Sequence, residues 1–177
     1  MRIITGKFGG RRIQPPANMP HTRPTTDIAK QGLFNILQSR MSFEDIITLD
    51  LFGGTGCISY ELASRGAAEQ IIVEKDPIMH QFIRKNMDML GVENVQILRM
   101  DVFAYLASVQ TNFNFIFAGP PYALSTIDDL PKIIVEKKLI APNGFFVLEH
   151  TPRNNYTGFN GFQFQRNYGT TVFSFFQ

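Results

Sequence analysis

The stretch LDLFGGTG, residues 49–56, joins a short apolar run to a segment with helical character. The run IITLDLF predicts a strand, and CISYELASRG predicts a helix that ends at Gly66. The glycines at 53, 54 and 56 let the backbone turn tightly and approach a ligand closely. A strand, a glycine-rich loop and a helix in this order are typical of nucleotide-binding α/β folds, although Ser59 leaves the dinucleotide pattern GxGxxG incomplete.

From residue 46 onward, apolar runs alternate with helical segments. Further strands are predicted at QIIVEKD, VQILRMD, FNFIFA and GFFVLEH, with helices at PIMHQFIRKNMDMLG, VFAYLASV and near IDDLPKIIVEKK. Strands separated by helices predict a parallel sheet covered on both faces. After Pro152, two alternating runs around Gly169 predict an antiparallel hairpin. The expected fold is a Rossmann-like α/β sheet, mostly parallel, closed by this C-terminal hairpin.

The composition restricts the class of protein. The 177 residues suit one domain, 44% are hydrophobic, and no apolar run reaches transmembrane length. The single cysteine, Cys57, allows no internal disulfide and indicates no metal cluster. The N-terminus lacks the apolar stretch of a signal peptide. We therefore expect a cytoplasmic monomer without a metal or a membrane partner.

Positive charge gathers at the N-terminus. Residues 1–40 hold seven Lys or Arg and one acid, Asp27, whereas residues 41–177 hold ten Lys or Arg and fourteen acids. RIITG and RRIQP flank a glycine turn and predict a β-hairpin, followed by a helix capped by Thr26 or Asp27. We expect a basic extension over 1–40 and one continuous globular unit over 41–177. A basic extension suits a polyanionic partner such as nucleic acid. The candidate contacts are Arg2, Lys7, Arg11, Arg12 and Arg23, although Arg23 could instead tie its loop to the body through Asp27.

Acidic residues stand at the ends of three successive predicted strands. They are Asp50, Glu74 and Asp101, and Glu74 lies twenty residues after Gly54. A carboxylate at that spacing can accept hydrogen bonds from both hydroxyls of a ribose. Asp50 could face the positively charged part of a nucleoside ligand. The glycine loop and the three acids together predict a nucleoside site.

These motifs resemble those of class I S-adenosylmethionine-dependent methyltransferases. RIITGKFGGRRI, TRPTTD (22–27) and LFNIL (33–37) narrow the resemblance to the RsmD family of bacterial 16S rRNA guanine-N2 methyltransferases, over nearly the whole chain. The resemblance implies a seven-stranded sheet, S-adenosylmethionine as methyl donor, and 16S rRNA or the small ribosomal subunit as substrate. It implies that Glu74 binds the ribose and that Asp101 with the Val102 backbone reads the adenine. The implied cofactor-binding residues are Asp50, Phe52, Gly53, Gly54, Gly56, Glu74, Lys75, Asp101 and Val102.

The run FNFIFAGPPYAL, residues 113–124, ends a strand in a turn that resembles the amino-methyltransferase motif [D/N]PP[Y/F]. In that motif the polar side chain and the carbonyl of the first proline accept from the amine, and the aromatic ring stacks on a flipped base. The implied catalytic residues are Gly119, Pro120, Pro121 and Tyr122, with glycine where the motif has Asp or Asn.

Three accounts of Gly119 remain open at this point. Backbone carbonyls could suffice, with Glu149 lending an acceptor from the next strand end. The enzyme could be slower than a version with Asp, so that Gly119→Asp would accelerate methyl transfer. The protein could also bind cofactor and RNA with little or no turnover. A DNA adenine-N6 methyltransferase is a further alternative, disfavoured by the short chain, and a nicotinamide oxidoreductase is disfavoured by Ser59 and the PPY turn.

Overall fold

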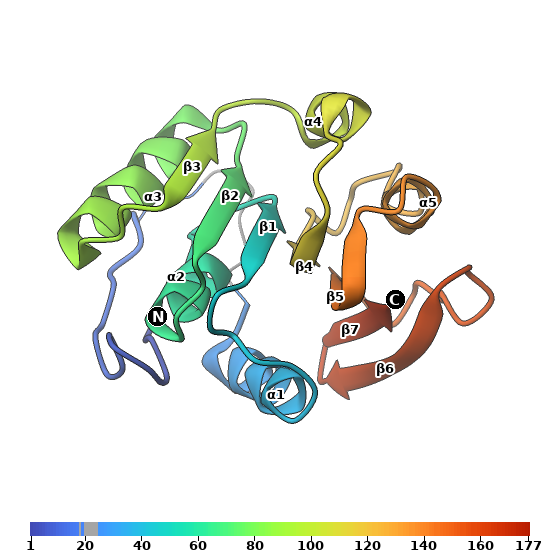
Figure 1. The fold of residues 1–177 in the computed structure, drawn as a ribbon, viewed down its shortest axis with the longest axis horizontal. Helices are drawn as coiled ribbons and strands as arrows, with labels where there is room; N and C mark the ends of the chain where they lie inside the picture. The colour runs from blue at the N-terminus through green and yellow to red at the C-terminus, as the bar shows by residue number, and fades with distance from the viewer. Residues whose placement is uncertain (18, 20–24) are drawn as a thin grey trace.

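The computed structural model describes residues 1–17, 19 and 25–177, which form a seven-stranded sheet with helices on both faces (Figure 1). The helices are α1 (Asp27–Gln38), α2 (Cys57–Ser64), α3 (Pro77–Leu90), α4 (Val102–Ser108) and α5 (Asp129–Glu136). The strands are β1 (Ile47–Leu51), β2 (Glu69–Val73), β3 (Val95–Leu98), β4 (Phe113–Ala118), β5 (Ile140–His150), β6 (Phe162–Tyr168) and β7 (Thr171–Phe176). The predicted alternation of strands and helices from residue 46 is confirmed.

The order of the strands reverses beside β1. Across the sheet the order is β3-β2-β1-β4-β5-β7-β6, and β1 pairs in parallel with β2 on one side and with β4 on the other. The chain builds outward from β1 to β3, then crosses back and builds outward again from β4. At such a reversal the loops that leave the two central strands separate, and a crevice opens at their carboxyl ends. The topology therefore places a ligand crevice after β1 and β4.

Strand β4 shows how the sheet is buried on both faces. Ile116 and Ala118 pack in the apolar cluster that contains α4 and α5, whereas Phe115 and Phe117 pack in the cluster that contains α1 and α2. All four side chains are buried. A strand covered on both sides reads as one continuous apolar run, which explains why the sequence shows no alternation there.

The helix limits follow from local chemistry. Thr26 caps α1 by accepting a hydrogen bond from the Ala29 amide at 3.2 Å. Asp76 caps α3 by accepting from the amides of Ile78 and Met79, each at 2.9 Å, and Gly91 ends that helix with a φ of 69°. Short polar side chains satisfy the first unpaired amides of a helix, and glycine adopts the left-handed conformation that ends one. The helix starts predicted at Thr26 and Pro77 are confirmed.

In the C-terminal hairpin the second strand, β7, lies inside the sheet, and the first strand, β6, lies at its edge. β6 and β7 turn at Gly169, which has a φ of 68°, and pair antiparallel as predicted. β7 inserts between β5 and β6, and all six of its residues are buried. β6 forms the edge of the sheet and is mostly exposed.

The first 13 residues form a compact turn with a single antiparallel bridge, between Arg2 and Arg12. The Ile3 amide donates to the Arg11 carbonyl at 3.0 Å, and the Gly10 amide donates to the Ile3 carbonyl at 2.8 Å. The predicted hairpin is therefore present, but its two arms are too short to count as strands. At Gly6 a Cβ would lie 1.9 Å from the Ser64 carbonyl oxygen, so the turn bends directly onto α2.

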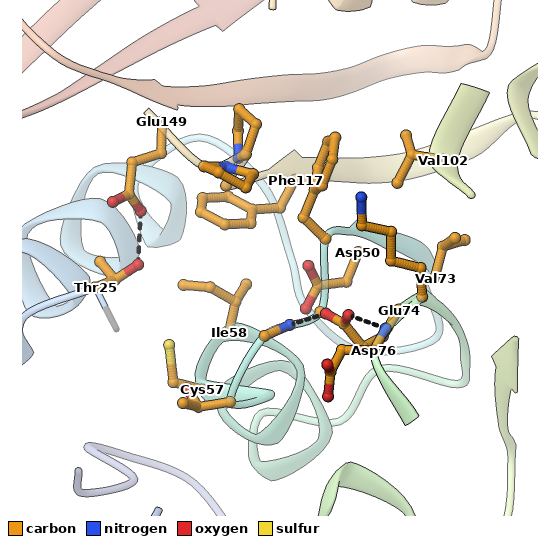
Figure 2. A pocket seen from close by; sticks show the side chains of 18 of the residues that line it. Thr25, Asp50, Cys57, Ile58, Val73, Glu74, Asp76, Val102, Phe117 and Glu149 are labelled. Atoms are coloured by element: carbon orange, nitrogen blue, oxygen red, sulfur yellow. Dashed lines mark hydrogen bonds between the residues drawn. The ribbon is translucent and has the colours of Figure 1, made fainter. Parts of the chain in front are cut away.

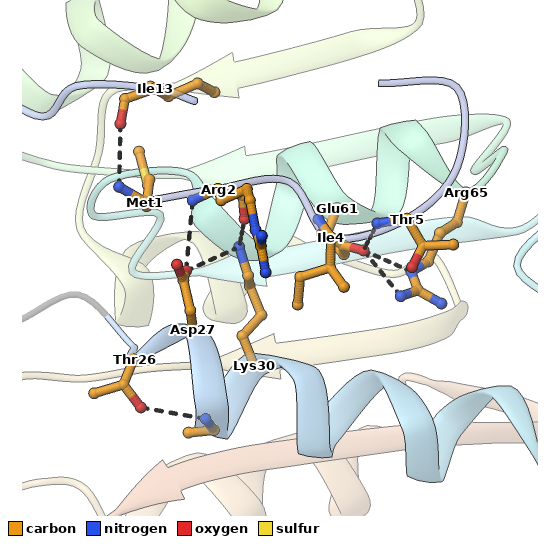
Figure 3. Close-up of polar contacts among 11 residues, drawn as sticks. Met1, Arg2, Ile4, Thr5, Ile13, Thr26, Asp27, Lys30, Glu61 and Arg65 are labelled. Carbon is orange, nitrogen blue, oxygen red and sulfur yellow. Dashed lines mark hydrogen bonds and ion pairs between the residues drawn. The ribbon is translucent and has the colours of Figure 1, made fainter. Parts of the chain in front are cut away.

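Glu61 on α2 fixes this N-terminal turn to the body (Figure 3). Its carboxylate is fully buried and accepts from the amides of Ile4 at 2.7 Å and Thr5 at 3.1 Å. Arg65 completes the cluster, with 2.9 Å between its Nη2 and Glu61 Oε1. On the other side, Lys30 Nζ donates to the Arg2 carbonyl at 2.5 Å. The backbone of the N-terminal turn is thus held by the carboxylates of Glu61 and Asp27, by the Lys30 ammonium group and by Ser64 of α2.

We expect Glu61→Gln to destabilise the protein by about 3–5 kcal/mol, because the buried Arg65 loses its charge partner and two amides lose a charged acceptor. Urea unfolding checks this value. Glu69→Gln, at an exposed position, is the matched control and should shift the free energy of unfolding by less than about 0.5 kcal/mol. A loss below about 1 kcal/mol for Glu61→Gln would contradict the anchoring role.

Candidate active site

A cavity of about 380 Å³ lies at the carboxyl ends of β1, β2 and β4, where the strand order reverses (Figure 2). This size suits a small organic ligand. Of the sequence-predicted residues, it is lined by Asp50, Phe52, Gly53, Gly54, Glu74, Lys75, Asp101, Val102, Gly119, Pro120, Pro121 and Tyr122. The structure therefore brings the glycine loop and the PPY turn to one place.

The loop after β1 is tightly packed at Gly53, which has no room for a side chain. A Cβ on Gly53 would lie 2.6 Å from Ile72 Cγ2, and Gly54 has a φ of 54°. Phe52 also adopts a positive φ, 65°, which is uncommon for an aromatic residue. Gly56 does not line the cavity; it begins α2 with a φ of 76° and packs against Tyr60.

Glu74 joins the ends of β1 and β2. Its Oε2 accepts from the Gly54 amide at 2.7 Å, and its Oε1 accepts from the Asp76 amide at 2.8 Å. Burial raises the pKa of Glu74, and these two backbone N–H groups act against that rise. Each carboxylate oxygen has a second lone pair, so Glu74 can hold the loop and still accept from a ligand.

Asp50 lies deeper in the cavity. It is 3% exposed, and its Oδ2 accepts from the Ser59 hydroxyl at 2.5 Å. Burial raises the pKa of Asp50 to about 7; the Ser59 hydrogen bond opposes the rise, and the carboxylates of Glu74 and Glu149 add to it. A positively charged ligand beside Asp50 would favour the ionised form.

Asp101 begins α4. Its Oδ1 accepts from the amides of Phe103 at 2.8 Å and Ala104 at 3.1 Å, so it acts as the helix cap as well as a cavity residue. Val102, next in the chain, is buried and presents an apolar side chain to the cavity. Lys75 lines the same wall and is exposed.

The PPY turn follows β4 directly. The Gly119 amide approaches the Leu51 carbonyl of β1 at 3.4 Å, which continues the pairing of the two strands to the cavity edge. Tyr122 is 37% exposed, and its hydroxyl donates to Glu149 Oε1 at 3.2 Å. The ring is therefore held at one end while it lines the cavity.

Sequence reasoning missed several cavity residues, among them Thr25, Phe117 and Ile58. The Thr25 hydroxyl donates to Glu149 Oε2 at 2.6 Å, a contact across 124 positions that no local pattern reveals. Cys57 is buried and also lines the cavity, and burial raises the pKa of its thiol to about 11.

The predicted nucleic-acid contacts lie mainly on the N-terminal turn. Arg2 is largely exposed, as are Lys7, Arg11 and Arg12. Arg11 and Arg12 border a second cavity of about 440 Å³, together with Lys85 of α3, a cation that sequence reasoning did not select. Arg23 lies outside the described residues.

The part of the chain that the structure describes lacks two features, a membrane-spanning helix and a cluster of metal ligands. No helix there has the length and apolar character needed to cross a bilayer. Within the same residues, no group of three His, Cys, Asp or Glu side chains is placed to hold a metal ion.

Comparison with known proteins identifies the family. A family model described as conserved hypothetical protein 95 matches residues 1–177. The chain belongs to this family. YlbH of Bacillus subtilis (strain 168), provisionally named an rRNA methyltransferase, is 34% identical over 154 residues, which cover 85% of this chain and 82% of that protein. Ribosomal RNA small subunit methyltransferase D of Escherichia coli (strain K12) is 29% identical over 154 residues, which cover 87% of this chain and 76% of that protein.

The solved structures agree. The protein yhhF of Escherichia coli, provisionally named a methyltransferase, superimposes with a TM-score of 0.85 at 25% identity, covering all of this chain and 97% of that one. The resemblance to the RsmD family is confirmed, and the protein is a methyltransferase with a Rossmann-like fold.

We expect Asp50→Asn to remove a pH-dependent penalty on stability. Asp50 ionises near pH 7 in the folded protein but near pH 4 when unfolded, so the folded state binds the extra proton between these values. The contribution of Asp50 to the free energy of unfolding is therefore fully present below about pH 4, and it is lost as the pH rises through about 7. The free energy of unfolding of Asp50→Asn, relative to that of the wild type, should therefore rise by about 2–3 kcal/mol between pH 5 and pH 8, measured by thermal unfolding.

The exposed Asp88→Asn serves as the control and should show no such gain between the two pH values. An Asp50→Asn difference that is the same at pH 5 and pH 8 would contradict the raised pKa.

Proposed function

We propose that this protein transfers a methyl group from S-adenosylmethionine to the N2 amine of a guanine in 16S rRNA. One observation carries the proposal: a single cavity has the glycine loop and Glu74 at one end and the Gly119–Tyr122 turn at the other. Membership of a family whose relatives are named for methylation of small-subunit rRNA supports the substrate class. Such a substrate implies a cytoplasmic location, and a monomer stays our prediction.

The donor set of the cavity fits S-adenosylmethionine. Glu74 has lone pairs left for the two ribose hydroxyls, and Gly53 and Gly54 of the neighbouring loop line the cavity beside it. We assign Asp101 and Val102, which line the cavity at the start of α4, to the adenine. Asp50 offers a buried negative charge to the cationic methionyl part. When bound, S-adenosylmethionine supplies an electrophilic methyl group on a sulfonium.

The other end of the cavity suits a purine base. We assign Tyr122 the role of a stacking platform for a base taken out of its helix, because aromatic rings stabilise unstacked bases. Its hydroxyl contact with Glu149 holds the ring while leaving it partly exposed. The carbonyl oxygens of Gly119 and Pro120 are acceptors for the protons of the base amine.

The exposed cations of the N-terminal turn are assigned to the RNA phosphates. Arg11 and Arg12 are exposed on a turn whose backbone is held by Glu61. Because the turn is already fixed in place, these side chains are available to bind phosphates. Lys85 extends the same positive surface onto α3. Phosphate contacts of this kind fix the position of an RNA while other groups read the base.

The proposal is tested by measuring S-adenosylmethionine binding by calorimetry, and methyl transfer to small subunits from cells that lack the endogenous methyltransferase. We expect N2-methylguanosine in the digested 16S rRNA. Glu74→Gln should weaken cofactor binding by about tenfold or more, because one charged acceptor is lost, whereas the exposed Glu93→Gln should not. Failure to bind the cofactor, or methylation of adenine in DNA instead of guanine in RNA, would overturn the proposal.

Arg11→Ala/Arg12→Ala should weaken RNA binding and lower the salt dependence of the affinity, with the slope of log K against log salt reduced by roughly 1–2. Filter binding of small-subunit RNA fragments between low and moderate salt measures both quantities. Lys132→Ala/Arg166→Ala, two exposed cations on α5 and β6, is the matched control. An unchanged slope in the Arg11/Arg12 variant would count against the turn as an RNA grip.

A further inference from the structure

Gly119 and Glu149 stand side by side at the cavity edge. β4 and β5 are parallel neighbours, and Ala118 pairs with Leu148, so the next residue of each strand is at the same level. Glu149 is 5% exposed and lines the cavity together with the PPY turn. The buried carboxylate of Glu149 thus lies beside residue 119, where this chain has glycine in place of the Asp or Asn of the methyltransferase motif.

The absence of a side chain at residue 119 leaves space for this carboxylate. A Cβ at residue 119 would lie 3.8 Å from Glu149 Oε2, in van der Waals contact, and 3.1 Å from Phe117 Cε1. An aspartate there would press on the Phe117 ring and bring a second carboxylate next to Glu149. Two carboxylates in contact repel each other and share a proton.

Two hydroxyl groups orient Glu149 toward the cavity. Thr25 donates to Oε2 at 2.6 Å and Tyr122 donates to Oε1 at 3.2 Å (Figure 2 shows the Thr25 contact). Both donors line the same cavity. The bond to Tyr122 links the carboxylate to the ring on which we place the base, so the two groups keep a fixed relation.

We propose that Glu149 is the catalytic carboxylate of this site and replaces the Asp or Asn that the motif carries before its two prolines. The inference rests on the proposed function, since it assigns an acceptor to the same amine. The amine nitrogen attacks the methyl carbon, the S–C bond breaks and its electron pair stays on sulfur. One amine proton, held by Glu149 as positive charge grows on nitrogen, passes to that carboxylate and then to water.

A purely structural Glu149 would instead tie the segment that leads into α1 to the end of β5, through Thr25. The two roles predict different results for a variant that moves the acid rather than removing it. A structural tie depends on a group at residue 149. A catalytic acceptor depends only on a carboxylate near the amine, whichever strand carries it.

Four variants separate these roles in single-turnover methyl transfer on undermethylated small subunits: Glu149→Gln, Gly119→Asp, Gly119→Asp/Glu149→Gln and Gly119→Ala/Glu149→Gln. We expect Glu149→Gln to be slower by about ten- to a hundredfold, with cofactor affinity within about twofold of wild type. Gly119→Asp alone should not accelerate transfer, in contrast to the expectation from sequence. Gly119→Asp/Glu149→Gln should recover at least about tenfold over Glu149→Gln, and Gly119→Ala/Glu149→Gln should not.

The melting temperature and the cofactor dissociation constant of each variant report whether it is folded. The proposal is overturned if Glu149→Gln transfers methyl at the wild-type rate, or if it is slow and Gly119→Asp does not rescue it. It is also overturned if the wild type binds cofactor but methylates nothing, because Glu149 would then be an inadequate acceptor. In the first two cases the proposed function still stands; a wild type that does not bind the cofactor, or that binds it and methylates nothing, removes both.

Discussion

The reversal of strand order beside β1 determines where everything else in this molecule can lie. Because β2 and β4 flank β1 in parallel, the chain leaves β1 toward one side of the sheet and later returns on the other. The loops after β1 and β4 therefore face each other across one crevice. The glycine bend and the PPY turn, more than sixty residues apart, meet for this topological reason and not because of any attraction between them.

Three buried carboxylates, Asp50, Glu74 and Glu149, line the resulting cavity. Burying acids near one another costs free energy unless each is hydrogen-bonded or meets a positive charge. Ser59, the Gly54 and Asp76 amides, Thr25 and Tyr122 supply the hydrogen bonds. Lys75 is the one cation among the described residues that line the cavity, and the carboxylates outnumber it, which favours a cationic ligand over a phosphate-bearing nucleotide.

Much of this arrangement could be predicted from the sequence, because short local patterns determine where the helices and strands begin and end. The signals act over a few residues: apolar runs mark strands, Thr26 caps a helix and Gly91 ends one. The helices, the strands and the parallel part of the sheet could therefore be predicted from these signals. Contacts between distant residues could not be found in this way: the insertion of β7 beside β5, the bond from Thr25 to Glu149, and the attachment of the N-terminal turn by Glu61. The roles of the site residues stay predictions, although nearly all of them line one cavity.

The position of β7 has a consequence for how the protein is made. The strand that completes the sheet interior is the last one to be synthesised, while its outer neighbour β6 precedes it in the chain. Until residues 171–176 leave the ribosome, the free edge of β5 has no partner, and β6, with a largely polar sequence, has nothing to pair with. An open apolar edge invites pairing with other chains. Nascent chains stalled or truncated just short of β7 should therefore be the species that need chaperones.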